Sequence, residues 1–326
     1  MFSQAMRSGP GSITSGRRKW TNYGFAPIPM SLHSITTSNR SDRLGGTAEP
    51  VPSNSALPAQ SVLEDLGRWL HHHRPVVVAL SGGVDSAVMA SLAFQYLDSD
   101  AVAVTGVSPS LSQQERQAAR RSADAVGIRH LEMTTDELSR PGYRANNGDR
   151  CYHCKSELYD LILAAEELQG HTIVDGAQAS DDAGDRPGMR ASGERGVESP
   201  LREFGIGKSQ VRALARQRGL PSWDRPARPC LASRVPVGTE VDVDLLRKVE
   251  AIEAILSGEG FSIYRARCAG TRVVIEVDPE ELANKRGDDW RRRLDAISLA
   301  LGFTDRWLDA RGYGGEGVPL LEPLFG

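Results

Sequence analysis

The sequence predicts an α/β protein: a parallel β-sheet with helices on both faces, followed by a smaller α+β domain. Between residues 61 and 222, short β-branched runs alternate with segments that are apolar at helical spacing. This alternation favours a parallel sheet whose ligands bind at the carboxyl ends of the strands. Beyond residue 222 the pattern becomes helix, strand pair, helix and strand, which indicates the second domain.

The length of 326 residues suits two domains. We expect a disordered tail over 1–60, because this segment is rich in Ser, Gly, Pro, Thr and Asn and has no sustained period. The sheet domain is expected over 61–222 and the smaller domain over 223–310. Residues 311–326 are expected to be a loose tail.

The composition excludes several classes of protein. The net charge is −3, so no global basic field favours a nucleic-acid partner. No apolar run approaches the roughly 20 residues of a membrane helix. Four cysteines are too few for a disulfide scaffold in a chain of this length. A cytoplasmic protein fits these features best.

The elements of the first domain follow from local periodicity. An amphipathic helix over 61–73 precedes the first strand, and a later helix opens with a capping box and closes at a glycine. The long polar segment 179–200 is expected to be a loop. The predicted strands are 76–80, 101–107, 128–133 and 172–175, and the predicted helices after the first strand are 86–97, 112–127 and 208–218.

The second domain is predicted in the same way. A helix over 242–256 places Leu245, Leu246, Val249, Ile252 and Leu256 on one face. Two strands, 261–267 and 271–277, flank a turn near Gly270. A helix over 290–301 and a strand over 303–308 complete the domain.

Ser81–Ser86, with the sequence SGGVDS, joins the first strand to the following helix. Gly82 and Gly83 can adopt backbone angles closed to other residues, which lets successive N–H groups form an anion nest. The helix start aims its positive end at the same point. Ser81 and Ser86 add hydroxyl groups, and Asp85 can hold a divalent cation such as Mg²⁺ between phosphate oxygens. Such a loop resembles the PP-loop ATP pyrophosphatases, which implies ATP as ligand and adenylation of a substrate oxygen.

Three cysteines form a second candidate site. Cys151 and Cys154 have the Cys-x-x-Cys spacing that lets two thiols reach one metal centre, and Cys230 lies in a Pro-rich turn. Three thiolates with one open position suit a [4Fe–4S] cluster. Zinc with His153 as a fourth ligand, a redox dithiol and a half-buried pair without metal are the alternatives. The two candidate sites together suggest one reaction. If the loop adenylates a substrate oxygen and a sulfur nucleophile then attacks, the result is insertion of sulfur into the substrate.

Together these motifs resemble the LarE family of ATP-dependent sulfur transferases over about residues 61–308. The resemblance rests on SGGVDS at 81–86, NGDRCYHCK at 147–155, DGA at 175–177, SPL at 199–201 and CLASR at 230–234, with shorter matches at 181–182, 186–189 and 223–226. It implies that ATP adenylates a carboxylate of pyridinium-3,5-biscarboxylic acid mononucleotide, which becomes a thiocarboxylate in nickel-pincer nucleotide biosynthesis.

The resemblance also implies roles for individual residues. Asp85, Lys155 and Cys230 would be catalytic, and Ser81, Gly82, Gly83, Asp85, Ser86 and Gly176 would bind the nucleotide. The substrate phosphate would be held by Ser233, Arg265, Arg267 and, more weakly, Glu253. Cys151, Cys154 and Cys230 would hold the cluster, although Cys230 is a single-use sulfur donor in another branch of the family. A homo-oligomer is common in the family.

Three other functions compete with this interpretation. A tRNA thiolase also combines an adenylating loop with three cysteines, but a basic surface and a lysine at position 84 would be expected, and Val84 stands there. An amide ligase of the NAD or GMP synthetase kind would leave the cysteines without a role. A non-enzymatic nucleotide-binding module would bind ATP without releasing pyrophosphate.

Overall fold

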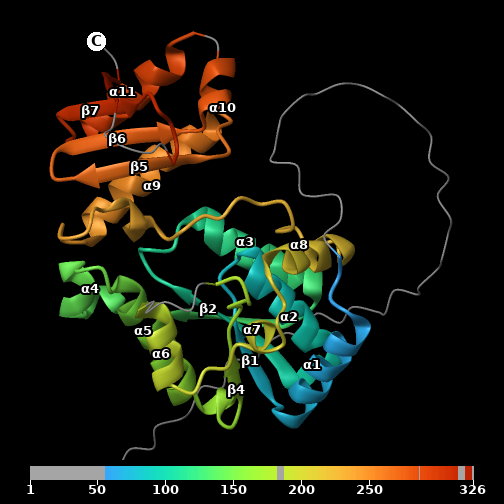
Figure 1. Cartoon of the computed structure of the whole chain (residues 1–326). Coiled ribbons are helices and arrows are strands. Elements are labelled where there is room, and N and C mark those ends of the chain that lie inside the picture. Colours follow the sequence, from blue (N-terminus) through green and yellow to red (C-terminus); the bar gives the residue numbers. More distant parts are fainter. Residues whose placement is uncertain (1–55, 182–186, 286, 315–319, 325–326) are drawn as a thin grey trace, which may run out of the picture. The chain divides into compact units, whose positions relative to one another are not determined.

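The computed structural model describes residues 56–181, 187–285, 287–314 and 320–324 and contains two four-stranded sheets within them (Figure 1). The first sheet has the order β3-β2-β1-β4, and every pair is parallel, with Val77 of β1 opposite Val102 and Ile173. This arrangement confirms the predicted parallel sheet. Its strands are β1 (Val76–Ala79), β2 (Ala101–Val107), β3 (Arg129–Thr134) and β4 (Thr172–Val174).

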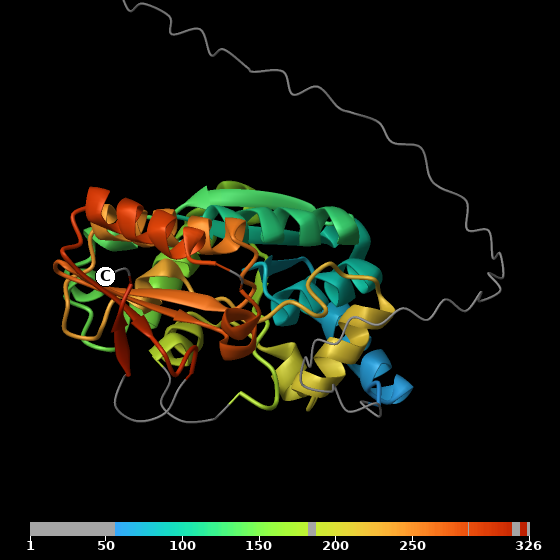
Figure 2. The same ribbon diagram turned by 90° about the horizontal axis from the view of Figure 1, so that it is seen from above.

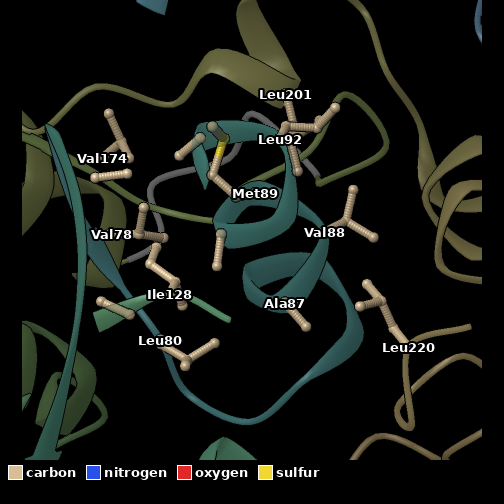
Figure 3. Close-up of a cluster of buried hydrophobic side chains, with 14 of the residues drawn as sticks. Val78, Leu80, Ala87, Val88, Met89, Leu92, Ile128, Val174, Leu201 and Leu220 are labelled. Carbon is tan, nitrogen blue, oxygen red and sulfur yellow. The ribbon is translucent and has the colours of Figure 1, made fainter. Parts of the chain in front are cut away.

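Helices cover both faces of this sheet because its central strands are apolar on both sides. Val76 and Val78 face one hydrophobic cluster, whereas Val77, between them, faces another. Figure 3 shows the first cluster, in which Val78 and Leu80 lie beside the helix that carries Met89. The helices of that face are α1 (Gln60–His72), α2 (Val84–Leu97), α3 (Gln113–Val126) and α8 (Lys208–Gln217), and the opposite face carries α5 (Arg150–Ala164) and η3 (Glu166–Leu168).

The second sheet has the order β5-β6-β7-β8. Its first two strands form the predicted antiparallel hairpin, β6 and β7 are parallel, and β7 and β8 are antiparallel. Helices α9 and α11 pack on it and on each other around a core that includes Leu246 and Ile275 (Figure 2). The elements are α9 (Val243–Gly258), β5 (Tyr264–Ala269), β6 (Arg272–Val277), α10 (Pro279–Asn284), α11 (Asp289–Ala300), β7 (Asp305–Asp309) and β8 (Leu321–Pro323).

Two predictions of irregular structure were wrong. Within 179–200, α6 (Pro187–Glu194) packs against α5 and buries Ala191 and Ser192, and α7 starts at Pro200. Within the expected tail 311–326, β8 pairs with β7, and Leu324 is buried in the second core. Both segments contain several Gly or Pro residues and have no sustained local period, so contacts with the rest of the protein are what stabilise α6 and β8.

The remaining elements are short. They are η1 (Asp98–Asp100), η2 (Glu137–Ser139), α4 (Pro141–Ala145), α7 (Pro200–Glu203) and η4 (Leu231–Arg234). Residues 1–55 of the expected N-terminal tail lie outside the described part of the chain, and the division at residue 222 stays a prediction. Among the described residues, no helix combines the length and the apolar character needed to span a bilayer.

Candidate functional site

In the loop between β1 and α2, only one of the two glycines, Gly82, adopts the left-handed backbone angles that were expected of both. Gly82 has φ +84°, and a Cβ there would lie 2.9 Å from the backbone nitrogen of Ala119. Gly83 has ordinary extended angles and is the N-cap of α2, which begins at Val84, two residues earlier than expected. Since glycine has no side chain to cap the helix, the first N–H groups of α2 are left for an anion.

The two serines of the loop hold each other in place. The Ser81 N–H donates to Ser86 Oγ at 3.1 Å, and the two hydroxyl oxygens are also 3.1 Å apart. Ser86 Oγ donates in turn to the Gly83 carbonyl at 3.2 Å. The hydroxyl groups therefore fix the curvature of the turn in addition to any contact with phosphate.

The loop after β4 lies against this turn. A Cβ on Gly176 would fall 2.5 Å from the Ser86 nitrogen and 2.7 Å from its Cα. Only glycine allows so close an approach, because no real Cβ tolerates such a distance. The carboxyl ends of β1 and β4, which are neighbours in the sheet, thus build one site, as predicted for a parallel sheet.

Asp175, the residue before this glycine, is a buried hub with 5% of its surface exposed. Its carboxylate accepts hydrogen bonds from Lys155 Nζ at 3.0 Å, Ser199 Oγ at 2.8 Å and the Ala177 N–H at 3.0 Å. Burial alone would raise the pKa of Asp175, but the Lys155 charge and these donors outweigh it and hold that pKa below its usual value. The ion pair likewise raises the pKa of Lys155 against the effect of burial. Both side chains are therefore charged at neutral pH.

Asp85, the residue predicted to bind a cation, is already paired with one. Lys208 Nζ donates to its two carboxylate oxygens at 2.9 and 2.7 Å. Lys208 is the first residue of α8, and 123 positions separate the two residues. An ammonium group at this place shows that the carboxylate can hold a positive charge, which fits the expected Mg²⁺.

The three cysteines converge from two segments. Cys151 and Cys154 lie in the first two turns of α5, and Cys230 precedes η4. Burial, the Glu137 carboxylate and the neighbouring sulfurs raise the pKa of Cys154. Burial and the Cys151 sulfur raise the pKa of Cys230. Cys151 and Cys230 are nevertheless exposed residues, and Cys154 is half-buried.

Across the described ranges, no three His, Cys, Asp or Glu side chains stand in metal-binding geometry. The donor chemistry of three neighbouring thiols suits a cluster, but the thiols are not drawn together around one point. The competing zinc site is weakened, because His153 Nε2 lies 3.3 Å from Asp149 Oδ2. A cluster at these cysteines therefore stays a prediction.

An ion pair fixes the segment that carries Cys230. Arg234 and Glu253 pair through two hydrogen bonds at 2.7 and 3.0 Å, with only 5% and 10% of their side chains exposed. Arg234 Nη1 donates to the Cys230 carbonyl at 3.2 Å and to Ser233 Oγ at 2.9 Å. Glu253, predicted to contact the substrate phosphate, is thus engaged with Arg234 and with the Ala266 N–H.

The two arginines of β5 lie on one face of the strand, as their spacing predicted. Arg265 Nη2 donates to Tyr313 Oη at 2.8 Å, and its guanidinium stacks 4.8 Å from the Tyr313 ring centroid. Arg267 pairs with Glu276. Within the described part of the chain, Arg265 Nε is buried and has no hydrogen-bond partner.

The site therefore has two parts. Around the nucleotide loop the structure brings together Ser81, Gly82, Gly83, Asp85, Ser86 and Gly176, with Lys155 beside them through Asp175. The second group consists of the neighbouring Cys151, Cys154 and Cys230, with Ser233 and Glu253 linked to the Cys230 segment through Arg234. Arg265 and Arg267 contact Tyr313 and Glu276, and their part in the site stays a prediction. Sequence reasoning missed Lys208 and the hub role of Asp175. A lysine in the first turn of a helix opposes the helix dipole, which is a signal that could have singled out Lys208.

The chain is similar in sequence to several known proteins. Residues 61–145 match a family model described as asparagine synthase. A pyridinium-3,5-bisthiocarboxylic acid mononucleotide synthase of Lactiplantibacillus plantarum is 31% identical over 78% of this chain and 89% of its own. An uncharacterized protein of Synechocystis sp. is 38% identical over 78% of this chain and 95% of its own. A tRNA-specific 2-thiouridylase of Azorhizobium caulinodans is 30% identical over 76% of this chain and 75% of its own.

Proposed function

We propose a substrate for this protein from one premise: the chain belongs to the LarE family of ATP-dependent sulfur transferases. The substrate is pyridinium-3,5-biscarboxylic acid mononucleotide, one carboxylate of which is converted to a thiocarboxylate. The support comes from the activity that the name of the Lactiplantibacillus relative states and from the presence of cysteines near the nucleotide loop.

One structural observation carries the proposal. Helix α5 carries Cys151 and Cys154 in its first two turns, and the next residue, Lys155, donates a hydrogen bond to Asp175 beside the nucleotide loop. Sulfur and the phosphate-binding loop are thus joined through one rigid helix. An amide ligase or a nucleotide-binding module would not require cysteines at this position next to the nucleotide loop.

The residues suggest a two-stage reaction. In the first stage a substrate carboxylate oxygen attacks the α-phosphorus of ATP, the bond to the β-phosphate oxygen breaks, and pyrophosphate leaves. We propose that the N-terminal N–H groups of α2 stabilise the departing charge and that Lys155, which is paired with Asp175 beside the loop, neutralises charge on the α-phosphate. In the second stage a sulfur nucleophile attacks the acyl carbon and AMP leaves with the bonding electrons.

We propose that Cys151, Cys154 and Cys230 together hold a [4Fe–4S] cluster, which would supply sulfur without consuming a cysteine. Arg265, Arg267 and Ser233 are proposed to hold the phosphate of the substrate mononucleotide, because two arginines on one strand face form a fork for an anion. Glu253 acts on this subsite through Arg234, which orients Ser233.

The first experiment is to determine iron, labile sulfide and zinc in protein purified without oxygen. About four irons per chain with broad absorbance would support the cluster. Zinc would favour a structural metal site, and loss of sulfur mass from Cys230 in metal-free protein would identify a single-use donor. Thiocarboxylate formation from the pyridinium substrate, followed by mass spectrometry, tests the reaction itself, and an unchanged substrate would refute it.

Two variants separate the stages. Asp85→Ala should abolish pyrophosphate release, whereas Cys230→Ala should preserve pyrophosphate release and stop sulfur transfer. Pyrophosphate release by the first variant would contradict the role of Asp85, and thiocarboxylate formation by the second would remove Cys230 from the mechanism.

A second candidate function is tRNA thiolation, which the similarity to the 2-thiouridylase favours. The net charge of −3 argues against it, since tRNA binding draws on basic surface. Assaying sulfur incorporation into tRNA beside the pyridinium substrate discriminates between the two.

A further inference from the structure

Asp85 of the nucleotide loop forms an ion pair with Lys208 of α8, and folding alone does not explain the lysine at this position. Asp85 is in the first turn of α2, where a carboxylate suits the helix dipole. Lys208 is in the first turn of α8, where a cation is disfavoured. A side chain that opposes its local environment is more often retained for function than for stability.

We propose that Lys208 is a phosphate ligand of the adenylation reaction, held by Asp85 until metal and nucleotide arrive. In the nucleotide-free protein, Lys208 neutralises Asp85. When Mg²⁺ and the ATP phosphates enter, Lys208 leaves the carboxylate and its ammonium group binds phosphate oxygens. The two residues thus exchange partners, because a carboxylate prefers a divalent cation and an ammonium group binds phosphate as a point charge.

The backbone of Lys208 is fixed so that only its side chain needs to move. Its N–H donates to Ser180 Oγ at 3.2 Å, and the Ser180 N–H donates to Gln178 Oε1 at 2.7 Å. A Cβ on the preceding residue, Gly207, would lie 2.9 Å from Ser180 Oγ. The start of α8 is therefore tied to the loop that follows Asp175 and Gly176, which itself lies against the phosphate turn.

The surroundings allow this movement. The side chains of Lys208 and Asp85 are 39% and 30% exposed, so neither is locked in the core. The other lysine of the site, Lys155, is committed to Asp175. Triphosphate with one Mg²⁺ carries a net charge of about −2, and Lys208 supplies a compensating charge once it is released from Asp85.

Binding measurements on three proteins test the exchange: wild type, Lys208→Met and the control Lys248→Met, whose lysine pairs with Asp244 on α9. With Mn²⁺ alone, we expect Lys208→Met to bind about tenfold more tightly than wild type, because Asp85 has lost its competing cation. With α,β-methylene-ATP and Mg²⁺, we expect Lys208→Met to bind about tenfold more weakly. Lys248→Met should match wild type in both titrations.

Opposite changes in the two affinities are the signature of an exchange. A merely structural role would weaken both, and loss of both affinities or no change in either overturns the proposal. Lys208→Arg should restore nucleotide binding in part, and adding Asp85→Asn to Lys208→Met should remove the gain in Mn²⁺ affinity. Neither titration involves the sulfur substrate, so the outcome is independent of which acceptor is thiolated.

Discussion

The backbone of Gly176 lies against the backbone of Ser86, so that the ends of β4 and β1 meet without an intervening side chain. A Cβ at Gly176 would fall 2.5 Å from the Ser86 nitrogen, which belongs to the first turn of α2. The geometry of the phosphate turn therefore depends on a residue about 90 positions away in the sequence.

Gly176→Ala should displace this turn and lower the affinity for nucleotide. Overpacking costs about 1–3 kcal/mol, which corresponds to roughly 5- to 150-fold in affinity when the strain falls on the binding turn. Gly193→Ala is the matched control, because its added Cβ meets no atom within 4 Å. Calorimetric titration with α,β-methylene-ATP would measure the affinity of both variants for nucleotide. Equal affinities would contradict the role of Gly176 in shaping the phosphate turn.

Glu253→Gln should destabilise the second domain by about 3–5 kcal/mol, because it leaves the buried Arg234 guanidinium without its charged partner. Urea unfolding measures this loss. Glu259→Gln is the control, since Glu259 pairs with the exposed Arg293 and should lose less than about 1 kcal/mol. A change in the alkylation rate of Cys230 in the folded Glu253→Gln protein would further show that the pair positions this thiol.

Glu132 should contribute to stability above pH 4.5 and lose that contribution in acid. Hydrogen bonds from Arg116 and Arg120 lower the pKa of Glu132 to about 2. A depressed folded-state pKa stabilises the protein above the unfolded value of 4.5, and the contribution disappears as the pH falls towards 2. The free energy of unfolding should therefore fall less steeply over this range in Glu132→Gln. Equal pH dependence of wild type and variant would refute this role.

Cys230 should be a slow nucleophile in metal-free protein at neutral pH. Burial and the Cys151 sulfur raise its pKa, so the thiolate fraction is smaller than in an unfolded chain. Iodoacetamide labelling, read by peptide mass spectrometry, should be slower at pH 7 than in denaturant and should accelerate as the pH is raised. Labelling at pH 7 as fast as in the denatured chain would contradict this prediction.

The sequence was sufficient for the parts of the fold in which local pattern and tertiary packing agree. The β-branched run of β1 and the SGGVDS turn identify the central strand and the nucleotide loop, because a buried strand and a glycine turn have strong local signatures. The Ser112 cap of α3 was also found, and its hydroxyl accepts the Glu115 N–H at 3.2 Å. The Glu115 carboxylate, however, pairs with Arg225, a residue of the segment that leads to Cys230.

What the sequence did not reveal depends on distant partners. Helix α6 was missed because Gly188 and Gly193 weaken its local propensity. The close packing at Gly188, where a Cβ would come within 3.3 Å of the Lys155 side chain, involves a residue of another helix. The pairs Asp85–Lys208 and Arg234–Glu253 join residues that no short-range pattern relates. Ion pairs of this kind can be recognised only in the folded structure.

Helix α5 has a consequence for how a reactive intermediate is handled. Cys154 and Lys155 are consecutive residues, so the peptide backbone holds their Cα atoms about 3.8 Å apart. If the proposed function holds, an acyl-adenylate formed beside Lys155 would lie next to the same end of α5 that carries Cys151 and Cys154, two of the proposed cluster ligands. Activation and sulfur transfer would then take place at one end of a single helix, which would leave the intermediate a short path on which water could hydrolyse it.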